Sequence, residues 1–380
     1  MKTEAPEGWR TSTIGQEADL LTGFPFPSSG YSADGVRLVR GSNVKRGMLD
    51  WGEPITEYWP KVHSDISRYQ LREGDLVVAM DGALVGRSFA AIDKKDVPSL
   101  LVQRVARLRS EKIQQGLMAA WIGSRAFESH VDALKTQTAI PHISPADIRA
   151  FPIVVPNQRE EQSAIASTLS DVDALLASLD ALIAKKRDIK QAAMQQLLTG
   201  KTRLPGFGGA WELKRVGDVL TIRHGKDQKA VMSSSGQYPI LATGGQIGWA
   251  KQWLYNRPSV LIGRKGTIDR PQYMDQPFWT VDTLFYSELK SKNVAKYFYY
   301  RFCLIDWLQY NEASGVPSLN ARTIETIELA CPEPEEQTAI AKVLSDMDAE
   351  LAALEARRDK TRQLKQGMVQ ELLTGKTRLV

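Results

Sequence analysis

The chain of 380 residues is 43% hydrophobic and 24% charged, which is the composition of a soluble globular protein with room for two domains. No run approaches the roughly 18 apolar residues of a membrane span and the N-terminus lacks the apolar core of a signal peptide, so we expect a cytoplasmic protein without a membrane. The net charge of +5 favours a polyanionic partner only weakly. About +4 of it lies within 206–331, where a basic face would be strongest.

Residues 1–155 form the first predicted domain. Short β-branched runs bounded by Gly and Pro, such as 74–78, predict strands, and 116–130 predicts a small helix, so we expect a strand-rich, irregular α/β domain. Three loops mix basic and polar residues: 40–46, 81–87 and 103–104. Such residues bind phosphates or read base edges. The candidates are Arg40, Asn43, Lys45, Arg46, Arg87 and Arg104.

Residues 156–205 predict one long helix. Its apolar residues recur in alternating steps of four and three, as in the seam of a coiled coil. They are Ile165, Leu169, Val172, Leu176, Leu179 and Ile183. Charge interrupts the seam at 185–187, which we interpret as a stutter because the stretch contains no proline. A helix of about 39 residues spans roughly 58 Å, too long to be buried in one domain, so it needs a helical partner.

Residues 206–331 repeat short sequence features of the first domain. Trp211 followed by 216–217 matches Trp9 followed by 14–15, and 316–320 matches 140–144. We therefore expect homologous scaffolds with different surfaces, the second with a small helix in 292–309. Basic and aromatic residues mix in loops 223–229, 244–251 and 264–270. The candidates for nucleic-acid contact here are Lys226, Lys229, Gln246, Lys251, Arg264 and Lys265.

Residues 332–380 repeat the first helix. The stretch 160–204 returns as 335–379 without a gap, and about 28 of the 45 aligned positions are identical, which indicates a duplication. The second seam consists of Ile340, Leu344, Met347, Leu351 and Leu354. The predicted fold is therefore α+β: two globular α/β domains separated by two long helices. Because 206–331 must return the chain between the helices, we expect an antiparallel coiled coil and a pseudo-twofold molecule.

This order of domains and helices resembles the specificity subunit of type I restriction-modification systems. Glu-Glu-Gln opens each helix, at 160–162 and 335–337, and Leu-Leu-Thr-Gly-Lys-Thr-Arg-Leu closes each, at 197–204 and 372–379. The stretches 204–207 before Trp211 and 260–267 before 279–283 also fit the family. The resemblance covers essentially the whole chain.

The resemblance implies that 1–155 and 206–331 are target-recognition domains, each reading half of a bipartite, asymmetric site in double-stranded DNA. Residues 156–205 and 332–380 would be conserved spacer helices, which act as a ruler and dock two modification (methyltransferase) subunits in the prokaryotic cytoplasm. The residues expected to dock these subunits are Ile165, Leu169, Leu176, Leu179, Ile340, Leu344, Leu351 and Leu354. S-adenosylmethionine, ATP and Mg would be bound by the modification and restriction subunits. This chain would be no enzyme, with no cofactor or metal of its own.

Other chemistry has weak support in the sequence. The stretches 199–202 and 374–377 look like the tail of a P-loop, but Gln195 and Gln370 stand where its earlier glycine belongs. The Pro-Pro-aromatic signature of adenine methyltransferases is absent. Asp282 with 288–290 suggests a nuclease centre only superficially. Cys303 and Cys331 lack the close spacing of a zinc site.

Two alternatives to the DNA-recognition subunit remain. One is a coiled-coil adaptor whose globular segments bind proteins and have no DNA specificity. The other is an enzyme whose site has no recognisable motif. Divergent loops on duplicated domains favour a reader of two different half-sites, because such a reader needs one frame and two surfaces.

Overall fold

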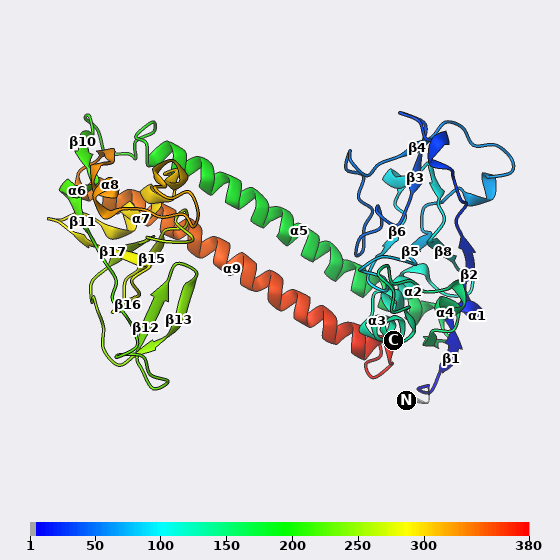
Figure 1. Cartoon of the computed structure of the whole chain (residues 1–380). Helices are drawn as coiled ribbons and strands as arrows, with labels where there is room; N and C mark the ends of the chain where they lie inside the picture. The colour runs from blue at the N-terminus through cyan, green and yellow to red at the C-terminus, as the bar shows by residue number, and fades with distance from the viewer. Residues whose placement is uncertain (1–4, 380) are drawn as a thin grey trace. The chain divides into compact units, whose positions relative to one another are not determined.

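The computed structural model describes residues 5–379, which divide into two compact units (Figure 1). Unit 1 comprises Met1–Ser178 with Arg357–Val380, and unit 2 comprises Leu179–Ala356. Each unit is mixed α/β, as predicted. The long helices α5 (Arg159–Leu197) and α9 (Pro334–Leu373) each contribute one part to either unit. Helix and strand segments along the chain thus match the predicted α+β class, while the coiled coil and the pseudo-twofold arrangement stay predictions.

Unit 1 contains one two-stranded, one four-stranded and one three-stranded sheet, with strand orders β1-β9, β2-β8-β5-β6 and β4-β3-β7. Only the β3–β7 pair is parallel among these pairs. The elements are β1 (Trp9–Thr13), α1 (Ile14–Glu17), β2 (Asp19–Thr22), β3 (Val36–Val39), β4 (Tyr58–Trp59), β5 (Leu76–Ala79), β6 (Phe89–Ala91), β7 (Ser99–Leu101), β8 (Val105–Arg109), α2 (Gln115–Ile122), α3 (Arg125–Leu134), α4 (Pro145–Arg149) and β9 (Pro152–Pro156).

Unit 2 repeats this topology, with orders β10-β18, β11-β17-β14-β15 and β13-β12-β16, the β12–β16 pair being parallel. The elements are β10 (Glu212–Arg215), α6 (Val216–Val219), β11 (Leu220–Arg223), β12 (Tyr238–Ala242), β13 (Gly245–Ala250), β14 (Ser259–Gly263), β15 (Gln272–Met274), β16 (Trp279–Thr280), β17 (Leu284–Leu289), α7 (Ala295–Phe302), α8 (Ala321–Thr326) and β18 (Glu328–Cys331). The expected homology of the two scaffolds is therefore confirmed strand by strand.

A close backbone approach recurs in both units. A Cβ atom on Gly23 would lie 2.1 Å from the carbonyl oxygen of Val102, and one on Gly225 would lie 2.0 Å from that of Val281. Only glycine leaves room for these contacts, which place the strand preceding each glycine against the second sheet. The shared sheet topology therefore rests on the same local requirement twice.

The small helices differ in detail from the sequence prediction. Residues 116–130 form parts of two helices, α2 and α3, because the chain breaks at Gly123 and Ser124. The Ser124 hydroxyl accepts a hydrogen bond from the backbone N–H of Phe127 and caps α3. In 292–309 the helix α7 stops at Phe302. A serine N-cap within an apolar stretch starts a new helix where periodicity alone suggests a continuous one.

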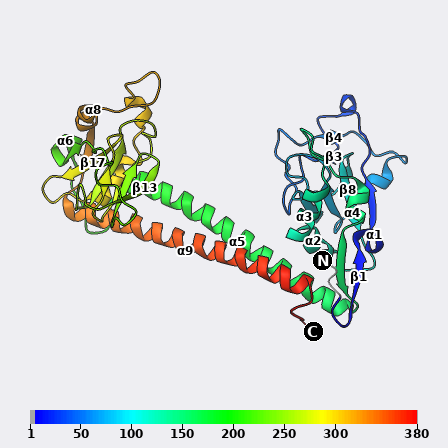
Figure 2. The ribbon, with the colours of Figure 1, turned by 60° about the horizontal axis from the view of Figure 1, so that its bottom comes forward.

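Both long helices run unbroken through their charged interruptions, as the stutter interpretation predicted. In unit 1 the start of α5 lies beside the end of α9 (Figures 1 and 2), and Ile165 and Leu169 share a core with Leu372 and Leu373. In unit 2 the end of α5 meets the start of α9, and three ion pairs join them: Lys186–Glu350, Arg187–Glu355 and Lys190–Asp348. The pairing is antiparallel within each unit.

An arginine after each helix fastens that helix to the first turn of the other. In unit 2, Arg203 bonds Glu336 with Nε–Oε1 at 2.7 Å and Nη2–Oε2 at 2.5 Å, and lies over the ring of Trp211. In unit 1, Arg378 forms the same bidentate pair with Glu161 over Trp9. Both glutamates are buried, where the N-terminus of a helix favours a negative charge. We call each of these groups an arginine clasp.

The clasps explain the tetrapeptides that look like a P-loop. Gly200 and Gly375 have φ of +72° and +69°, the left-handed conformation that ends a helix. A Cβ on Gly200 would lie 3.3 Å from the Trp211 ring. The glycine turns the chain back and the arginine three residues later reaches the glutamate. The Gly-Lys-Thr-Arg sequence thus closes a helix instead of cradling a phosphate.

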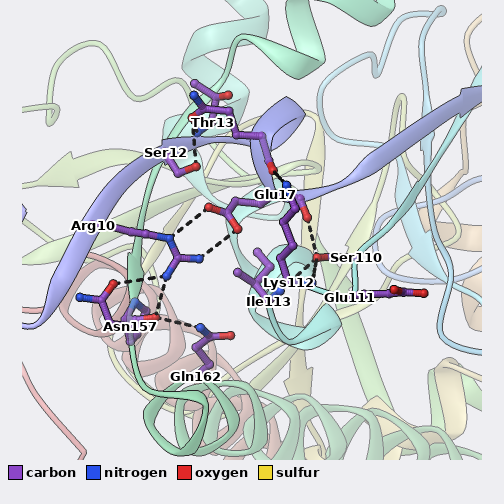
Figure 3. Close-up of polar contacts among 12 residues, drawn as sticks. Arg10, Ser12, Thr13, Glu17, Ser110, Glu111, Lys112, Ile113, Asn157 and Gln162 are labelled. Carbon is purple, nitrogen blue, oxygen red and sulfur yellow. Dashed lines mark hydrogen bonds and ion pairs between the residues drawn. The ribbon is translucent and has the colours of Figure 1, made fainter.

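A polar network joins the first sheet of unit 1 to the start of α5 (Figure 3). Arg10 donates to Glu17 at 3.3 and 3.0 Å and also to the side chain of Asn157. Gln162 donates to the carbonyl of Pro156 at 2.8 Å. Burial opposes the charge on Glu17, but hydrogen bonds from Arg10 and Ser12 outweigh it and lower the pKa of Glu17. The carboxylate is therefore the form that the fold stabilises.

Replacing Arg203 by Ala should lower the thermal unfolding midpoint of the chain, because it leaves the Glu336 carboxylate buried without its cation. Lys201→Ala removes an equal charge from the same loop and should leave the midpoint within about a degree, since the side chain is exposed. Differential scanning calorimetry of both variants checks this. Equal midpoints would contradict the clasp.

Glu17→Gln should destabilise the protein by about 1–2 kcal/mol at pH 7, because the charge-assisted bonds from Arg10 are lost. The folded-state pKa of Glu17 is lowered from 4.5, so its contribution is complete above pH 4.5 and is lost as pH falls below that value. The difference in urea unfolding between wild type and variant should shrink between pH 5 and pH 3, as an approximate range. A difference that grows as the pH falls would contradict this assignment.

Candidate nucleic-acid interface

Three loops predicted from the first segment converge at one place in unit 1. One carboxylate oxygen of Asp81 accepts a bond from Arg104 at 3.4 Å. The other oxygen lies beside Gly41, 3.2 Å from where its Cβ would be. The backbone of Asp81 also forms an antiparallel β-bridge with that of His142. We call the residues Gly41, Met80–Gly82, Gln103–Arg104 and Ile140–His142 corner 1.

The equivalent residues of unit 2 also come together. The backbone of Lys265 forms a β-bridge with that of Ser318. The Arg264 side chain donates to the carbonyl of Asp282 at 3.2 Å. A Cβ atom on Gly266 would lie 3.6 Å from the Thr243 hydroxyl. We call the residues Thr243, Arg264–Gly266, Asp282–Thr283 and Val316–Ser318 corner 2. It unites the predicted loop 264–270 with the 316–320 stretch that marked the internal repeat.

The two corners share one backbone frame. The N–H of Gly82 donates to the carbonyl of Pro141 at 3.0 Å, and that of Gly266 to Pro317 at 2.9 Å. Ile143 donates to Met80, and Leu319 to Arg264, both at 2.9 Å. Met80 in turn donates to Arg104 at 2.9 Å, and Arg264 to Thr283 at 2.8 Å. Matching these bonds makes Asp81 equivalent to Lys265, and Arg104 equivalent to Thr283.

The candidate cations of unit 1 have acidic partners. Arg46 and Arg87 both pair with Glu128 on α3, and Arg87 also pairs with Asp132 at 3.1 Å. The remaining pairs are Arg40 with Glu57 at 3.7 Å, Lys45 with Asp50 at 3.8 Å and Arg104 with Asp81. Corner 1 and its surroundings thus carry oriented, largely neutralised cations.

Asn43 holds its own loop together. It is fully buried, and its amide donates to the carbonyls of Asp50 and Ile55 at 3.0 and 3.1 Å. Its oxygen accepts from the backbone N–H of Arg40. With these internal bonds, the side chain supports loop 40–55 and is not presented to solvent.

The candidate cations of unit 2 are less engaged. Among residues 5–379, Lys226, Lys229, Lys251, Arg264 and Lys265 form no ion pair with a carboxylate. All but the partly buried Arg264 are exposed. Gln246 is also exposed and bonds only the nearby carbonyl of Gly248 at 3.2 Å. Unpaired cations interact strongly with phosphates.

Corner 2 opens into a pocket of about 330 Å³. Two cations and an imidazole face this pocket together with polar groups. Its lining is His224, Arg264, Lys265, Phe285, Glu312, Ser318, Leu319, Asn320 and Ala321. The imidazole of His224 packs edge-on against Phe285. The pocket gives corner 2 a concave, cationic surface.

Sequence reasoning missed the exposed apolar residues at these surfaces. Ile140 in corner 1 and Val316 in corner 2 occupy equivalent places and are 62% and 66% exposed. Trp249 and Trp253, near the candidate Lys251, are also exposed. In both 140–144 and 316–320 an aliphatic residue stands directly before the proline. We interpreted these residues as part of the shared scaffold and not as exposed side chains. Each corner therefore combines polar groups with one exposed aliphatic side chain.

The residues of the suggested nuclease centre lie toward opposite ends of β17. Asp282 precedes β17, whereas Glu288 lies near its far end and pairs with Arg223 at 2.8 Å. Within residues 5–379 no group of three or more His, Cys, Asp and Glu side chains is placed to hold a metal ion. Burial raises the pKa of the Cys331 thiol to about 11, so it is protonated at neutral pH. Over the same residues, no helix has the length and apolarity that crossing a membrane requires.

The two units thus share one backbone frame and carry unlike polar corners. The sequence matches the family model of the type I restriction modification DNA specificity domain over residues 6–186 and 209–365. The chain belongs to this family, as the resemblance in the sequence indicated.

Curated relatives agree with this assignment. Over 200 residues the chain is 30% identical to the type I restriction enzyme EcoAI specificity subunit of Escherichia coli, covering 51% of this chain and 32% of that protein. It is 28% identical over 205 residues to the MjaVIII specificity subunit of Methanocaldococcus jannaschii, covering 53% of this chain and 48% of that protein. The chain thus spans between a third and a half of these relatives.

Solved structures show the same fold. The S subunit of a type I restriction-modification system from M. genitalium matches with a TM-score of 0.68 at 16% identity, covering 98% of both chains. The HsdS subunit from Thermoanaerobacter tengcongensis matches with a TM-score of 0.51 at 16% identity and 99% coverage of both. At this identity the likeness concerns the fold alone.

Lys265→Ala should weaken binding to duplex DNA of every sequence and reduce the slope of log affinity against log salt by about one, because an unpaired lysine contributes as a single phosphate contact. Fluorescence anisotropy over a series of salt concentrations measures both quantities. Lys292→Ala removes an exposed lysine of unit 2 outside the corner and should change neither. Identical curves for wild type and Lys265→Ala would remove corner 2 from the interface.

Proposed function

We propose that this chain is the DNA sequence-recognition subunit of a type I restriction-modification complex and that it reads a bipartite, asymmetric site. The observation that supports this most directly is the pair of corners. One frame, held by matched hydrogen bonds, carries Asp81 and Arg104 in unit 1 and Lys265 and Thr283 in unit 2. A reader of two different half-sites requires such a frame with two different surfaces.

In this proposal the chain performs no chemistry. It positions two adenine methyltransferase subunits, which bind S-adenosylmethionine, and restriction subunits that use ATP and Mg, all in the prokaryotic cytoplasm. The two relatives described above are named as specificity subunits of restriction enzymes, which supports a recognition role. Sequence selectivity then arises from base contacts at the corners, and affinity from cations such as Lys265.

The helices supply the surface for the methyltransferase subunits in this proposal. Six of the eight predicted docking residues are buried, and Leu176 and Leu354 are half-buried, so these side chains serve the seam and the unit cores. The exposed apolar residues on the helices are instead Leu175, Leu182 and Ile189 on α5 and Leu364 on α9. The first three recur every seven residues and so follow one face of α5. We propose this outer face as part of the docking surface.

The modular proposal is tested by exchanging residues 206–331 for the same segment of another family member. Coexpression with the modification subunits of the system, followed by genome-wide mapping of methylated adenines, should show one changed half-site and one unchanged. The exchange preserves Trp211 and the clasp when the borrowed segment carries a tryptophan at that position. A change in both halves would contradict separate readers. Wild-type methylation at adenines with no common sequence would favour the protein adaptor.

A further inference from the structure

We propose that Arg104, held in place by Asp81, reads a guanine in the half-site bound by unit 1. Thr283, at the equivalent place, gives unit 2 a different preference at the matching base pair. This inference rests on the proposed function and assigns part of the specificity to named side chains. Arg104 is the base-reading residue, and Asp81 is a positioning residue.

The backbone of Arg104 sets it apart from its equivalent. Its φ is +64°, and among residues 5–379 only Ser291 shares a positive φ without being glycine. Such a conformation is unfavourable for any residue with a Cβ atom and concentrates at functional sites. The carbonyl of Thr283 accepts a backbone hydrogen bond from Arg264, as that of Arg104 does from Met80, but Thr283 has no positive φ. Both residues occupy the third position of a turn, closed by Val105 N–H to the Val102 carbonyl at 3.2 Å and by Leu284 N–H to the Val281 carbonyl at 3.0 Å. The two turns differ in φ at this position, so the two side chains leave the backbone in different directions.

Asp81 then fixes the guanidinium from one side. The carboxylate is only 22% exposed and is wedged beside Gly41, whereas the Arg104 side chain is 63% exposed. Asp81 engages one nitrogen of the guanidinium, Nη1, at 3.4 Å, so its other N–H groups stay available for the O6 and N7 atoms of guanine. The Asp81 carboxylate repels a phosphate, which carries the same charge, whereas the edge of a guanine base is uncharged.

The other arginines near corner 1 are arranged differently. Arg46 and Arg87 converge on Glu128 and so connect their loops to α3. Arg104 pairs with Asp81, and two further residues of corner 1, Gln103 and the aliphatic Ile140, are exposed. An aliphatic group beside a guanidinium can contact a thymine methyl group or exclude water from the base contact. Val316 retains this apolar element in corner 2, where the arginine is absent.

The decisive variant is Arg104→Gly, because glycine adopts the left-handed backbone without strain and removes only the side chain. Arg104→Lys keeps the charge but cannot form the planar bidentate contact. Asp81→Asn keeps the size and removes the orienting charge. Arg68→Ala, at an exposed arginine of unit 1 outside the corner, controls for the loss of one positive charge.

Each full-length variant is purified with the modification subunits of its system. Its binding is measured on duplexes that carry the wild-type methylation site and every single base-pair substitution in it. Wild type should lose about tenfold or more in affinity when one particular G·C pair is replaced. Arg104→Gly and Arg104→Lys should reduce that ratio to within about twofold and leave the other half-site unaffected. Arg68→Ala should keep the wild-type ratio.

The possible outcomes separate the proposals. If Arg104→Gly weakens all duplexes equally and Arg104→Lys restores them, Arg104 is a phosphate contact and the inference is wrong. An unchanged ratio in Arg104→Gly also overturns it, while the proposed function stands because wild type still discriminates. An unchanged ratio in Asp81→Asn alone would overturn the positioning role. Wild-type binding that ignores every substitution would overturn both the proposed function and this inference.

Discussion

The structure of both units depends on one interaction, the arginine clasp. A glutamate in the first turn of a long helix is buried, and the arginine that follows the other long helix neutralises it over a tryptophan face. Without that cation the glutamate would be an isolated charge in a nonpolar setting, which is strongly unfavourable. The end of α5 must therefore be present for unit 2 to satisfy Glu336, and the end of α9 for unit 1 to satisfy Glu161. Unit 1 is therefore built from two segments of the chain and includes Arg357–Val380, whereas unit 2 is the continuous segment Leu179–Ala356, which already holds both the end of α5 and the start of α9.

The clasps join the ends of the long helices in each unit, and they involve none of the corner residues, which differ between the two units. In corner 1 Arg104 has one carboxylate partner, Asp81, 3.4 Å from its guanidinium. In corner 2 Arg264 and Lys265 face a pocket that Glu312 also lines, and among the described residues neither cation forms an ion pair with a carboxylate. The first arrangement favours selectivity and the second favours electrostatic attraction, which depends on salt. Under the proposed function, a single frame would thus support two physical modes of recognition within one chain.

Much of the fold could be predicted from sequence because the duplication exposes it. The long helices, the duplicated scaffold and the equivalence of 140–144 with 316–320 follow from repeated residues whose spacing is visible in one dimension. The corners could be predicted only as separate loops. That Asp81 meets Arg104 depends on the pairing of β5 with β8, a contact between distant residues that no local pattern encodes. The burial of Asn43 could not be predicted for the same reason. Its amide donates to the carbonyls of Asp50 and Ile55, and nothing in the basic loop around it indicates these contacts.

The long helices show most clearly where duplication constrains a sequence and where it does not. Seam residues such as Ile165 and Ile340 stay apolar in both copies because each belongs to the core of a unit as well as to the helix pairing. On the outer face no core imposes this requirement. There α5 carries Leu175, Leu182 and Ile189, whereas the matching positions of α9 are Glu350, Arg357 and Leu364. The duplication therefore keeps apolar residues where the core of a unit requires them and lets the solvent-facing positions of the two helices diverge, because scattered exposed apolar side chains cost a fold little.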